Sequence, residues 1–202
     1  MRSLIEGLMG ARVGEDEFRS FATVIRALAR RWASHPQAFA EAGSAPAPFA
    51  GMEDFPDRSP LVGRSNPIAP PMLLDPDLEG GEVRGEVTFG RAYEGAPGCV
   101  HGGFLAAAFD EALGLACIFS GHPGMTGELT IQYRNPTPTR MRLAITARFE
   151  RQEGRRIYTS GEMRAGKRVT CRAEGLFIAI GADKFEDLKR LRDGSAQAGR
   201  RR

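Results

Sequence analysis

The pattern of hydrophobic and polar positions is most regular between residues 82 and 181. Apolar and polar residues alternate along residues 128–134 and again along residues 143–150. Two further segments rich in apolar residues, 157–164 and 169–180, follow with only short polar stretches between them. Alternation with a period of two is typical of strands that bury one face. We therefore predict four consecutive antiparallel strands in this part of the chain.

A long apolar segment precedes these strands. Residues 101–120 are rich in Ala, Leu and Phe, and Ile118 is their only β-branched residue. This composition predicts a buried helix. Residues 82–89 alternate weakly and predict a strand before it, while residues 152–155 and 165–167 are placed as hairpin turns. A strand, one buried helix and an antiparallel meander indicate an α+β fold in which a curved sheet wraps around the helix.

The first part of the chain has a different pattern. A helical periodicity runs from Glu15 to about Ala42, with acidic residues near its start and arginines nearer its end, as the helix dipole favours. Its apolar residues recur at helical spacing, at Phe18, Val24, Ile25, Leu28 and Trp32. We interpret this helix as a packing arm that covers a core or a partner subunit, in preference to a ligand-binding role.

Prolines separate this helix from the main domain. Eight of them fall between residues 43 and 81, too many for regular structure, and they predict an extended connection over the surface. The predicted organisation therefore has four parts. They are an N-terminal helical extension at 1–42, a proline-rich connection at 43–65, the main domain at 66–181 and a basic tail at 182–202.

Composition narrows the function classes. Of the 202 residues, 42% are hydrophobic and 26% are charged, which is typical of a globular protein. The net charge of +3 includes the arginines that end the sequence, and no RNA-type aromatic motif accompanies them, so we expect no nucleic-acid partner. No apolar run reaches 18 residues, and residues 1–14 lack the apolar core of a signal peptide. We therefore expect no membrane span.

The three cysteines, Cys99, Cys117 and Cys171, are widely spaced and odd in number. They form neither a CxxC pair nor a cluster with histidines, so we expect no zinc site and no disulfide framework. Free thiols are typical of a reducing compartment, and we expect a cytoplasmic protein. The sequence implies no metal and no bound organic cofactor.

The sharpest local feature is the segment from Gly98 to Gly103, where the buried helix is predicted to begin. Gly102 and Gly103 leave the backbone bare, so that another group can approach it closely. The first turn of a helix has N–H groups without helical partners, and the dipole adds positive potential there. This arrangement suits an anion or a carbonyl oxygen that gains negative charge. Tight packing explains such a glycine pair equally often.

Asp110 is a carboxylate within the apolar helix, seven residues after Gly103 and therefore on the same face. Because burying an unpaired charge is costly, it is solvated, paired with an arginine or functional; its neighbour Glu111 is expected to be solvated or salt-bridged. The axial distance of about 10 Å to the Gly103 amide is too long for one side chain to bridge. If the two groups cooperate, the acid comes from a second copy of the helix in a two-fold dimer.

His101-Gly102-Gly103 with Asp110 nine residues after the histidine resembles the hotdog-fold acyl-CoA thioesterases, particularly the phenylacetate-pathway and THEM-type branch. The stretches from Tyr93 to Gly103 and from Thr126 to Pro136 are similar to the THEM-type version, and the resemblance covers about residues 66–181. It implies a hotdog fold, in which the helix lies in a curved antiparallel sheet and dimers place their sites at the interface. Coenzyme A then enters as part of the substrate.

The resemblance also implies roles for individual residues. The N–H of Gly103, with that of Gly102, polarises the thioester carbonyl, and Asp110 of the opposite protomer acts as general base or as nucleophile. Thr126 orients the water or the carboxylate, and His101 shapes the turn and contacts the thioester region. Related enzymes often carry an asparagine six residues before the histidine. Here that position is Gly95, which shifts part of its role to the neighbouring Glu94.

The substrate is expected to lie along the helix and the sheet. Apolar residues of the helix are the candidates for the acyl pocket, namely Phe104, Leu105, Phe109 and Leu113. Arginines are candidates for the nucleotide phosphates of coenzyme A, and Arg134, Arg140, Arg142 and Arg168 are each equally explained as sheet surface charge.

The hypothesis is therefore an acyl-CoA thioesterase that forms a homodimer and possibly a homotetramer, as a dimer of dimers. Two alternatives remain open. One is a hotdog hydratase or dehydratase, which usually pairs a catalytic histidine with a carboxylate. The other is a non-catalytic acyl-CoA binding protein, which the missing asparagine and the long N-terminal arm make plausible.

Overall fold

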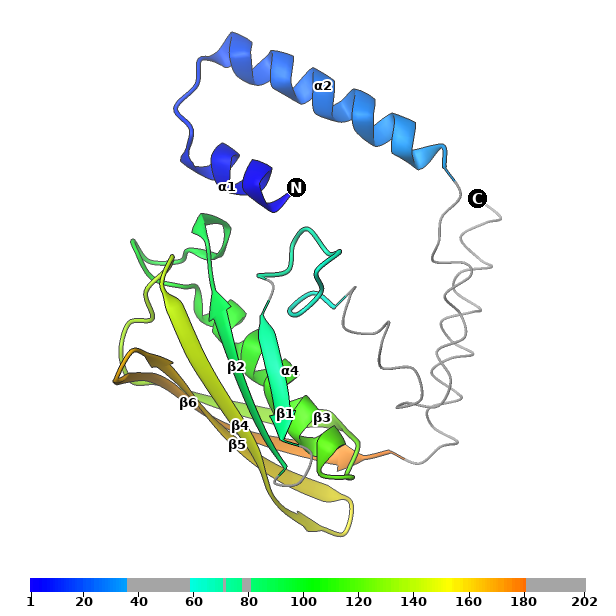
Figure 1. The fold of residues 1–202 in the computed structure, drawn as a ribbon, viewed down its shortest axis with the longest axis vertical. Helices are drawn as coiled ribbons and strands as arrows, with labels where there is room; N and C mark the ends of the chain where they lie inside the picture. The colour runs from blue at the N-terminus through cyan, green and yellow to red at the C-terminus, as the bar shows by residue number, and fades with distance from the viewer. Residues whose placement is uncertain (36–58, 71, 78–80, 181–202) are drawn as a thin grey trace.

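The computed structural model describes residues 1–35, 59–70, 72–77 and 81–180 (Figure 1). Its elements are, in chain order, α1 (Arg2–Gly10), α2 (Glu15–Ala33), β1 (Leu73–Asp77), β2 (Glu82–Thr88), the 3-10 helix η2 (Arg91–Tyr93), α4 (Gly102–Phe119), β3 (Gly124–Tyr133), β4 (Arg142–Glu153), β5 (Arg156–Ala165) and β6 (Arg168–Ala179). The expected strand, buried helix and four later strands are all present, which confirms the predicted α+β class. The predicted four-stranded meander is wrong in one respect, because only β4, β5 and β6 pair in chain order, whereas β3 pairs with β6.

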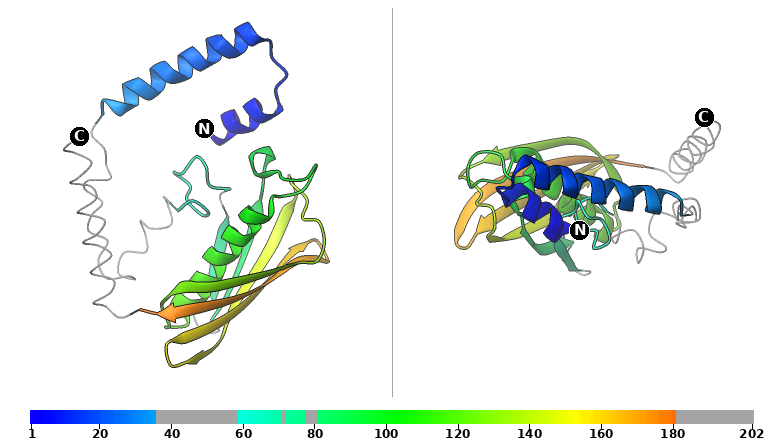
Figure 2. Two further views of the ribbon diagram at one scale, coloured as in Figure 1. Left: turned by 180° about the vertical axis from the view of Figure 1, so that it is seen from behind. Right: turned by 90° about the horizontal axis from the view of Figure 1, so that it is seen from above.

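The six strands form one antiparallel sheet in the order β1-β2-β4-β5-β6-β3. The sheet curves around α4, which lies along one of its faces (Figures 1 and 2). β3 comes directly after α4 in the chain but pairs with β6, the last strand, so it forms an edge of the sheet. Within the described residues, the other side of β3 has no strand partner. The site described below lies along this edge.

The core is the interface between α4 and the sheet. The largest fully buried side chains include Phe109 and Leu113 of α4 and Phe177 of β6. α4 approaches the sheet closely at Gly161 of β5 and Gly175 of β6, where a Cβ atom would lie 3.3 and 3.2 Å from Leu113. Glycine at these two strand positions lets the apolar helix pack directly onto the backbone of the sheet.

Two tight hairpins connect the last three strands where the sequence predicts turns. Gly154 lies between β4 and β5 with φ of 60°, and Gly166 lies between β5 and β6 with φ of 59°. Glycine adopts this left-handed conformation without steric cost, so it is the residue that two such short loops require. The turns hold the meander in the register that buries alternate residues against α4.

α4 is also long and apolar enough, by length and composition alone, to cross a membrane, with a mean hydropathy of 1.5 over Gly102–Phe119. Its helical bounds thus give an 18-residue apolar span, where the sequence analysis expected none. The core helix of a sheet protein passes the same test. Leu105, Phe109 and Leu113 are buried in the sheet, which accounts for the composition of α4.

The N-terminal region contains two helices, whereas the sequence predicted only the second. α1 is tied to the main domain by Glu6, whose carboxylate accepts a hydrogen bond from the Arg91 N–H at 2.8 Å and pairs with the Arg91 side chain at 3.6 Å. The guanidinium of Arg2 donates to the carbonyl oxygens of Asn66 and Arg64 at 2.9 and 3.0 Å. α1 is therefore fastened over η2 and the segment that leads into β1.

α2 confirms the predicted amphipathic helix, but it ends at Ala33, before the predicted end near Ala42. None of its residues is buried, so in the described part of the chain it does not cover a core. Residues 36–58 and 181–202, which include most of the predicted connection and the basic tail, lie outside the described residues.

The contact between α4 and the sheet gives a test of the fold. In Gly161→Val, the new Cβ would lie 2.8 Å from the carbonyl oxygen of Thr146 and 3.3 Å from Phe109. We expect this overpacking to lower the free energy of unfolding by about 2 kcal/mol, measured by urea denaturation. Ser160→Val, the matched control on the opposite face of β5, should change it by less than about 0.5 kcal/mol. Equal stability of the two variants would contradict this packing.

Candidate active site

A short, closely bonded loop leads into α4. Glu94 and Val100 form an isolated antiparallel bridge, and the His101 N–H donates to the Tyr93 carbonyl at 2.8 Å. At the tip, Gly98 has φ of 72°, and its N–H donates to the Glu94 carboxylate at 3.1 Å. The sequence predicts that Glu94 takes over part of the role of the missing asparagine. In the structure its carboxylate holds the tip of the loop instead.

His101 is the N-cap residue of α4. Its backbone is extended, with φ −62° and ψ 133°, and its Nδ1 accepts a hydrogen bond from the Gly103 N–H at 3.1 Å. This bond requires that Nδ1 carry no proton. The imidazole thus acts as the N-terminal cap of the helix, a role that Ser, Thr, Asp or Asn usually fills.

The cap changes which amide of the first turn is accessible. The N–H of Gly103, expected to be the main donor to a carbonyl, already donates to His101. The N–H of Phe104 donates to the His101 carbonyl at 3.0 Å. The N–H of Gly102 donates to no described residue, and Gly102 is the first residue of the helix. The donor that remains for a ligand is therefore Gly102.

Gly95 lies directly beneath His101. A Cβ atom on Gly95 would lie 2.9 Å from the Cα and 3.1 Å from the Cβ of His101. Real Cβ atoms essentially never come within 3.0 Å of other heavy atoms, so a side chain here would displace His101. An asparagine, which the family resemblance implies at this position, does not fit the loop as it is folded here.

Asp110 lies two helical turns after the start of α4, and Thr126 holds its carboxylate. The Thr126 hydroxyl donates to Oδ1 of Asp110 at 2.6 Å, and both residues are exposed. Asp110 makes no ion pair with a described residue, which removes the core-arginine interpretation for this part of the chain. One hydrogen bond from a hydroxyl orients the carboxylate and leaves its other oxygen open.

A β-bulge places Thr126 opposite Asp110. The register between β3 and β6 shifts between Thr126 and Glu128, so Gly127 is the extra residue on β3. A bulge bends a strand and turns its side chains to a new direction, and bulges are frequent beside active sites. Thr126 and Asp110 were both predicted as site residues, and the structure brings them together.

Glu111 is not the solvated neighbour that the sequence suggested. It is half-buried, and its Oε1 accepts a hydrogen bond of 3.0 Å from the hydroxyl of Ser59, which is itself buried. Desolvation raises the pKa of the Glu111 carboxyl above its ordinary value. The Ser59 hydrogen bond opposes this rise, and the nearby charge of Asp110 adds to it. Glu111 thus fastens the segment before β1 to α4.

Tyr133 is a site residue that sequence reasoning missed. Its hydroxyl donates to the Gly102 carbonyl at 3.0 Å, and a Cβ on Gly102 would lie 3.1 Å from this hydroxyl oxygen and 3.3–3.4 Å from the ring. Desolvation raises the pKa of this phenol. Tyr133 ends β3, whereas Thr126 lies near its start. One strand therefore holds both Asp110 and the first residue of α4.

A cavity of about 390 Å³ opens beside the start of α4. Its lining includes Gly102, Leu105, Tyr133 and Arg134. Phe104 is partly exposed nearby, with its ring edge-on to Tyr93 at 4.9 Å and to His101 at 6.3 Å between ring centroids. Phe104 and Leu105 therefore remain candidates for contact with an acyl chain.

Phe109 and Leu113, which the sequence predicts as acyl-pocket residues, are core residues in the single chain, and their contact with an acyl chain stays a prediction. Both are fully buried, and a Cβ atom on Gly161 would lie 3.3 Å from each of their side chains. Neither lines the cavity beside the start of α4 or the cavities at the sheet face and beside α1. Their role is to hold α4 on the sheet. Periodicity alone does not distinguish such core contacts from pocket-lining contacts.

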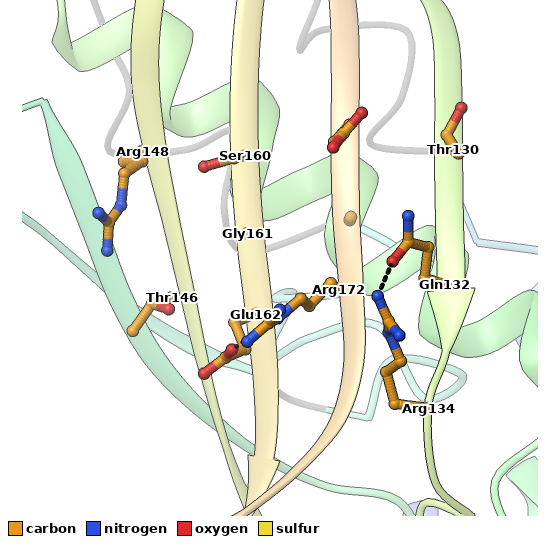
Figure 3. A pocket seen from close by; sticks show the side chains of 11 residues that line it. Thr130, Gln132, Arg134, Thr146, Arg148, Ser160, Gly161, Glu162 and Arg172 are labelled. Carbon is orange, nitrogen blue, oxygen red and sulfur yellow. Dashed lines mark hydrogen bonds and ion pairs between the residues drawn. The ribbon is translucent and has the colours of Figure 1, made fainter.

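Arg134 stands between two cavities. One is the cavity at the start of α4, and the other, of about 480 Å³, lies over the face of the sheet that faces away from α4 (Figure 3). Its guanidinium donates to the Gln132 side chain at 2.6 Å. Of the other candidate arginines, Arg142 is paired with Glu86. Of the four candidate arginines, Arg134 is the one that lines the same cavity as Gly102.

The thiols and carboxylates offer no obvious metal centre. Among the described residues, no three His, Cys, Asp or Glu side chains group closely enough to hold an ion. The cysteines are unpaired, and burial raises the pKa of Cys117 to about 12. Cys117 and Cys171 are buried core residues, while Cys99 lies on the loop before α4.

Within one chain, the acid and the open amide do not meet. Asp110 follows Gly102 by eight residues of continuous helix, which corresponds to about 12 Å along the axis. No side chain of Asp110 reaches the N–H of Gly102 over this distance. A site that uses both groups requires two chains.

Comparison with known proteins agrees with this fold. Residues 97–172 match the family described as the thioesterase superfamily. A crystallised thioesterase superfamily protein is 31% identical, with a TM-score of 0.75 over 88% of this chain and 90% of that one. The chain belongs to the thioesterase superfamily and has the hotdog fold.

Two further relatives are informative. Acyl-coenzyme A thioesterase THEM4 of Xenopus laevis is 34% identical over 89 residues, which are 43% of this chain and 40% of that protein. The chain thus matches about two fifths of the length of such curated relatives. A hypothetical thioesterase of Streptococcus pneumoniae, crystallised with coenzyme A, has 21% identity and a TM-score of 0.51 over 55% of this chain and 89% of its own. This last likeness concerns the fold.

The burial of Glu111 gives a prediction for pH. Its raised pKa means that the folded state binds this proton more tightly than the unfolded chain, whose ordinary value is 4.5. The resulting stability is present below the ordinary value and is lost as the pH rises through the raised one. As the pH rises from the ordinary value through the raised pKa, Glu111→Gln should therefore gain free energy of unfolding relative to the wild type.

Denaturant titrations at several pH values measure this difference. Ser59→Ala is the matched variant, because it removes the hydrogen bond that favours the charged carboxylate. It should move the pH-dependent loss of stability to higher pH. A Glu111→Gln variant that loses stability relative to the wild type as pH rises would show that the carboxylate is instead stabilised by folding.

Proposed function

We propose that this protein hydrolyses acyl-CoA thioesters to a free acid and coenzyme A, at sites shared between two subunits. One observation carries the proposal. The Gly102 N–H is open at the start of α4, and a Thr126-oriented Asp110 is exposed on the same helix at a distance that one chain cannot close. These are a donor for a carbonyl oxygen and a base for water, which are the two groups that thioester hydrolysis requires.

The chemistry follows from their positions. The thioester carbonyl accepts a hydrogen bond from the Gly102 N–H, and the dipole of α4 stabilises the charge that develops on its oxygen. Asp110 removes a proton from water as the water attacks the carbonyl carbon. The C–S bond then breaks, and the thiolate of coenzyme A leaves and takes up a proton. Direct attack by Asp110 is the alternative and would form an anhydride that water hydrolyses.

The edge strand β3 offers a surface through which two chains can associate. We propose that it pairs antiparallel with the same strand of a second copy, with the two-fold axis between Leu129 and Thr130. Thr126 then lies opposite the partner's Tyr133. Because Thr126 holds Asp110 and Tyr133 holds Gly102, this register brings Asp110 toward the partner's Gly102. A ten-residue edge with open N–H and C=O groups is also a surface that natural proteins usually cover.

The relatives support the substrate class. THEM4 is named as an acyl-coenzyme A thioesterase, and the Streptococcus pneumoniae protein was crystallised with coenzyme A. Variants of the latter replace an aspartate or a threonine sixteen positions later, and Asp110 and Thr126 have the same separation. We assign Arg134, at the cavity beside Gly102, to the phosphates of coenzyme A.

The alternatives are less well supported. A hydratase or dehydratase needs a histidine base, and Nδ1 of His101 is engaged as the cap of α4. A non-catalytic binding protein has no need for a carboxylate oriented by a hydroxyl on an exposed face. An amide donor and a carboxylate are sufficient for hydrolysis, so we propose that the reaction uses no metal or organic cofactor.

The first test concerns Asp110. In a thiol-release assay over acyl-CoAs of different chain lengths, Asp110→Asn should lower kcat by about 10³-fold, because the amide cannot accept the proton from water. Thr126→Val keeps the base and removes only its orienting hydroxyl, so a smaller loss of about 10-fold is expected. Binding of coenzyme A should persist in both. Full turnover by Asp110→Asn, or no turnover by the wild type on any acyl-CoA, would refute the proposed reaction.

The second test removes one N–H from the backbone. Proline is accepted at the first position of a helix, and His101 already has the extended conformation that a following proline requires. Gly102→Pro therefore deletes the donor, whereas Gly102→Ala adds a Cβ against Tyr133 and keeps the donor. We expect Gly102→Pro to lose about 10²-fold more kcat than Gly102→Ala. Equal activity of the pair would exclude Gly102 as the donor.

Mixed dimers then test whether the site is shared. Asp110→Asn and Gly102→Pro chains, each inactive alone, form one intact site per mixed dimer if the acid and the donor come from different subunits. A random mixture should recover about a quarter of the wild-type activity. No recovery, despite mixed dimers identified by mass spectrometry, would mean that each site lies within one chain.

A further inference from the structure

α2 presents an unusually continuous apolar surface. Its apolar side chains recur at alternating spacings of three and four, at Phe18, Phe21, Ile25, Leu28 and Trp32. More than half of Phe18 and Trp32 is exposed, at 56% and 61%, and no residue of α2 is buried. Side chains with this 3-4 spacing form the apolar seam through which one helix packs along another, and we call these five residues the seam. Large exposed seams of this kind mark an interaction surface.

The main domain of the same chain does not cover this seam. α1 lies between α2 and the sheet in both side views (Figures 1 and 2). The hydrogen bonds of the α2 side chains are local, from Arg19 to Glu15 at 2.6 Å and from Thr23 to the Arg19 carbonyl at 2.9 Å. The occupant of the seam therefore has to come from outside the described part of the chain.

The N-terminal region is not peculiar to this sequence. The crystallised superfamily protein of 31% identity aligns with 88% of the chain, whereas residues 59–202 make up less than three quarters of it. The alignment must therefore extend into the residues before Ser59. At least part of the N-terminal region therefore has a counterpart in a folded relative.

The charges beside the seam identify the partner. On one flank, Glu17, Val24 and Arg31 follow each other at intervals of seven residues, so they line the same edge of the seam. In an antiparallel pair, this edge meets itself. Glu17 then faces the partner's Arg31, and Val24 faces the partner's Val24. In a parallel pair this edge meets the other flank, where Ala22 and Ala29 offer no opposite charge.

We propose that α2 is a self-association helix that pairs antiparallel with α2 of a second copy of this chain. The apolar seam is buried between the two helices, and two Glu17–Arg31 pairs flank a central Val24–Val24 contact. The antiparallel arrangement also opposes the two helix dipoles, with the acidic first turn of each helix near the basic last turn of the other. This contact is separate from the β3 edge and from the proposed reaction.

Cysteine cross-linking tests the pairing in the full-length chain. In a Cys99→Ala background, which leaves only the buried Cys117 and Cys171, Val24→Cys should form a covalent dimer on oxidation. Thr23 directly precedes Val24 and lies on the helix face away from the seam, so Thr23→Cys should not form a covalent dimer. Leu28→Cys reports a parallel pair, in which identical seam residues meet. A dimer only from Leu28→Cys, or equal dimer from Val24→Cys and Thr23→Cys, would overturn the proposal.

Charge reversal gives an independent readout. Glu17→Arg and Arg31→Glu, each alone, should lower the yield of the Val24→Cys dimer about five-fold, and the two together should restore it. Trp32 is the single tryptophan of the chain, so its fluorescence reports the seam directly. Its emission should be blue-shifted in the wild type and red-shifted in either single variant. Failure of the double variant to recover would overturn the Glu17–Arg31 pairing.

A membrane surface is the competing occupant, because arginines and aromatic residues also suit an amphipathic helix at an interface. Vesicles of mixed neutral and anionic lipids distinguish the two. If Trp32 emission shifts only when vesicles are added and Val24→Cys gives no dimer without them, α2 is a membrane-binding helix and the proposal is wrong.

Discussion

Two hydrogen bonds between β3 and α4 fix the geometry on which the proposed site depends. Tyr133 at the end of β3 holds the carbonyl of Gly102, and Thr126 near its start holds the carboxylate of Asp110. The helix is also packed directly on the sheet at Gly161, so it has little freedom to slide along the strand. The open amide and the acid therefore keep a fixed separation, set by the rise of one helix.

Much of this fold could be predicted from the sequence because its elements are long and regular. The meander follows from strict alternation, and the glycines at 154 and 166 mark its hairpins. α4 follows from its apolar composition and the lack of β-branched residues. Asp110 was found as a carboxylate within the apolar helix and Thr126 through a family resemblance, and the structure joins them by a hydrogen bond. These features depend on residues that are close together in the sequence, so they can be predicted from it.

The hydrogen bonds of the site could not be predicted, because they depend on contacts that the spacing of residues in the sequence does not encode. That Nδ1 of His101 occupies the Gly103 amide is a matter of side-chain orientation, and it moves the open donor to Gly102. Tyr133 and Ser59 reach α4 from residues far away in the chain. α1 was missed for a similar reason, because it is short and is held by tertiary contacts rather than by a strong helical pattern of its own.

An edge strand in a single chain is a hazard, because its open backbone groups pair readily with other strands. In this fold the same strand also holds both proposed functional groups of α4. Pairing β3 with its own copy would cover the hazardous edge and complete the site in a single contact. One surface would then serve both catalysis and solubility. A chain that fails to pair would lose its activity and also the protection of its edge. Such a coupling would explain how an acid and an amide that lie about 12 Å apart in one chain could serve the one proposed reaction.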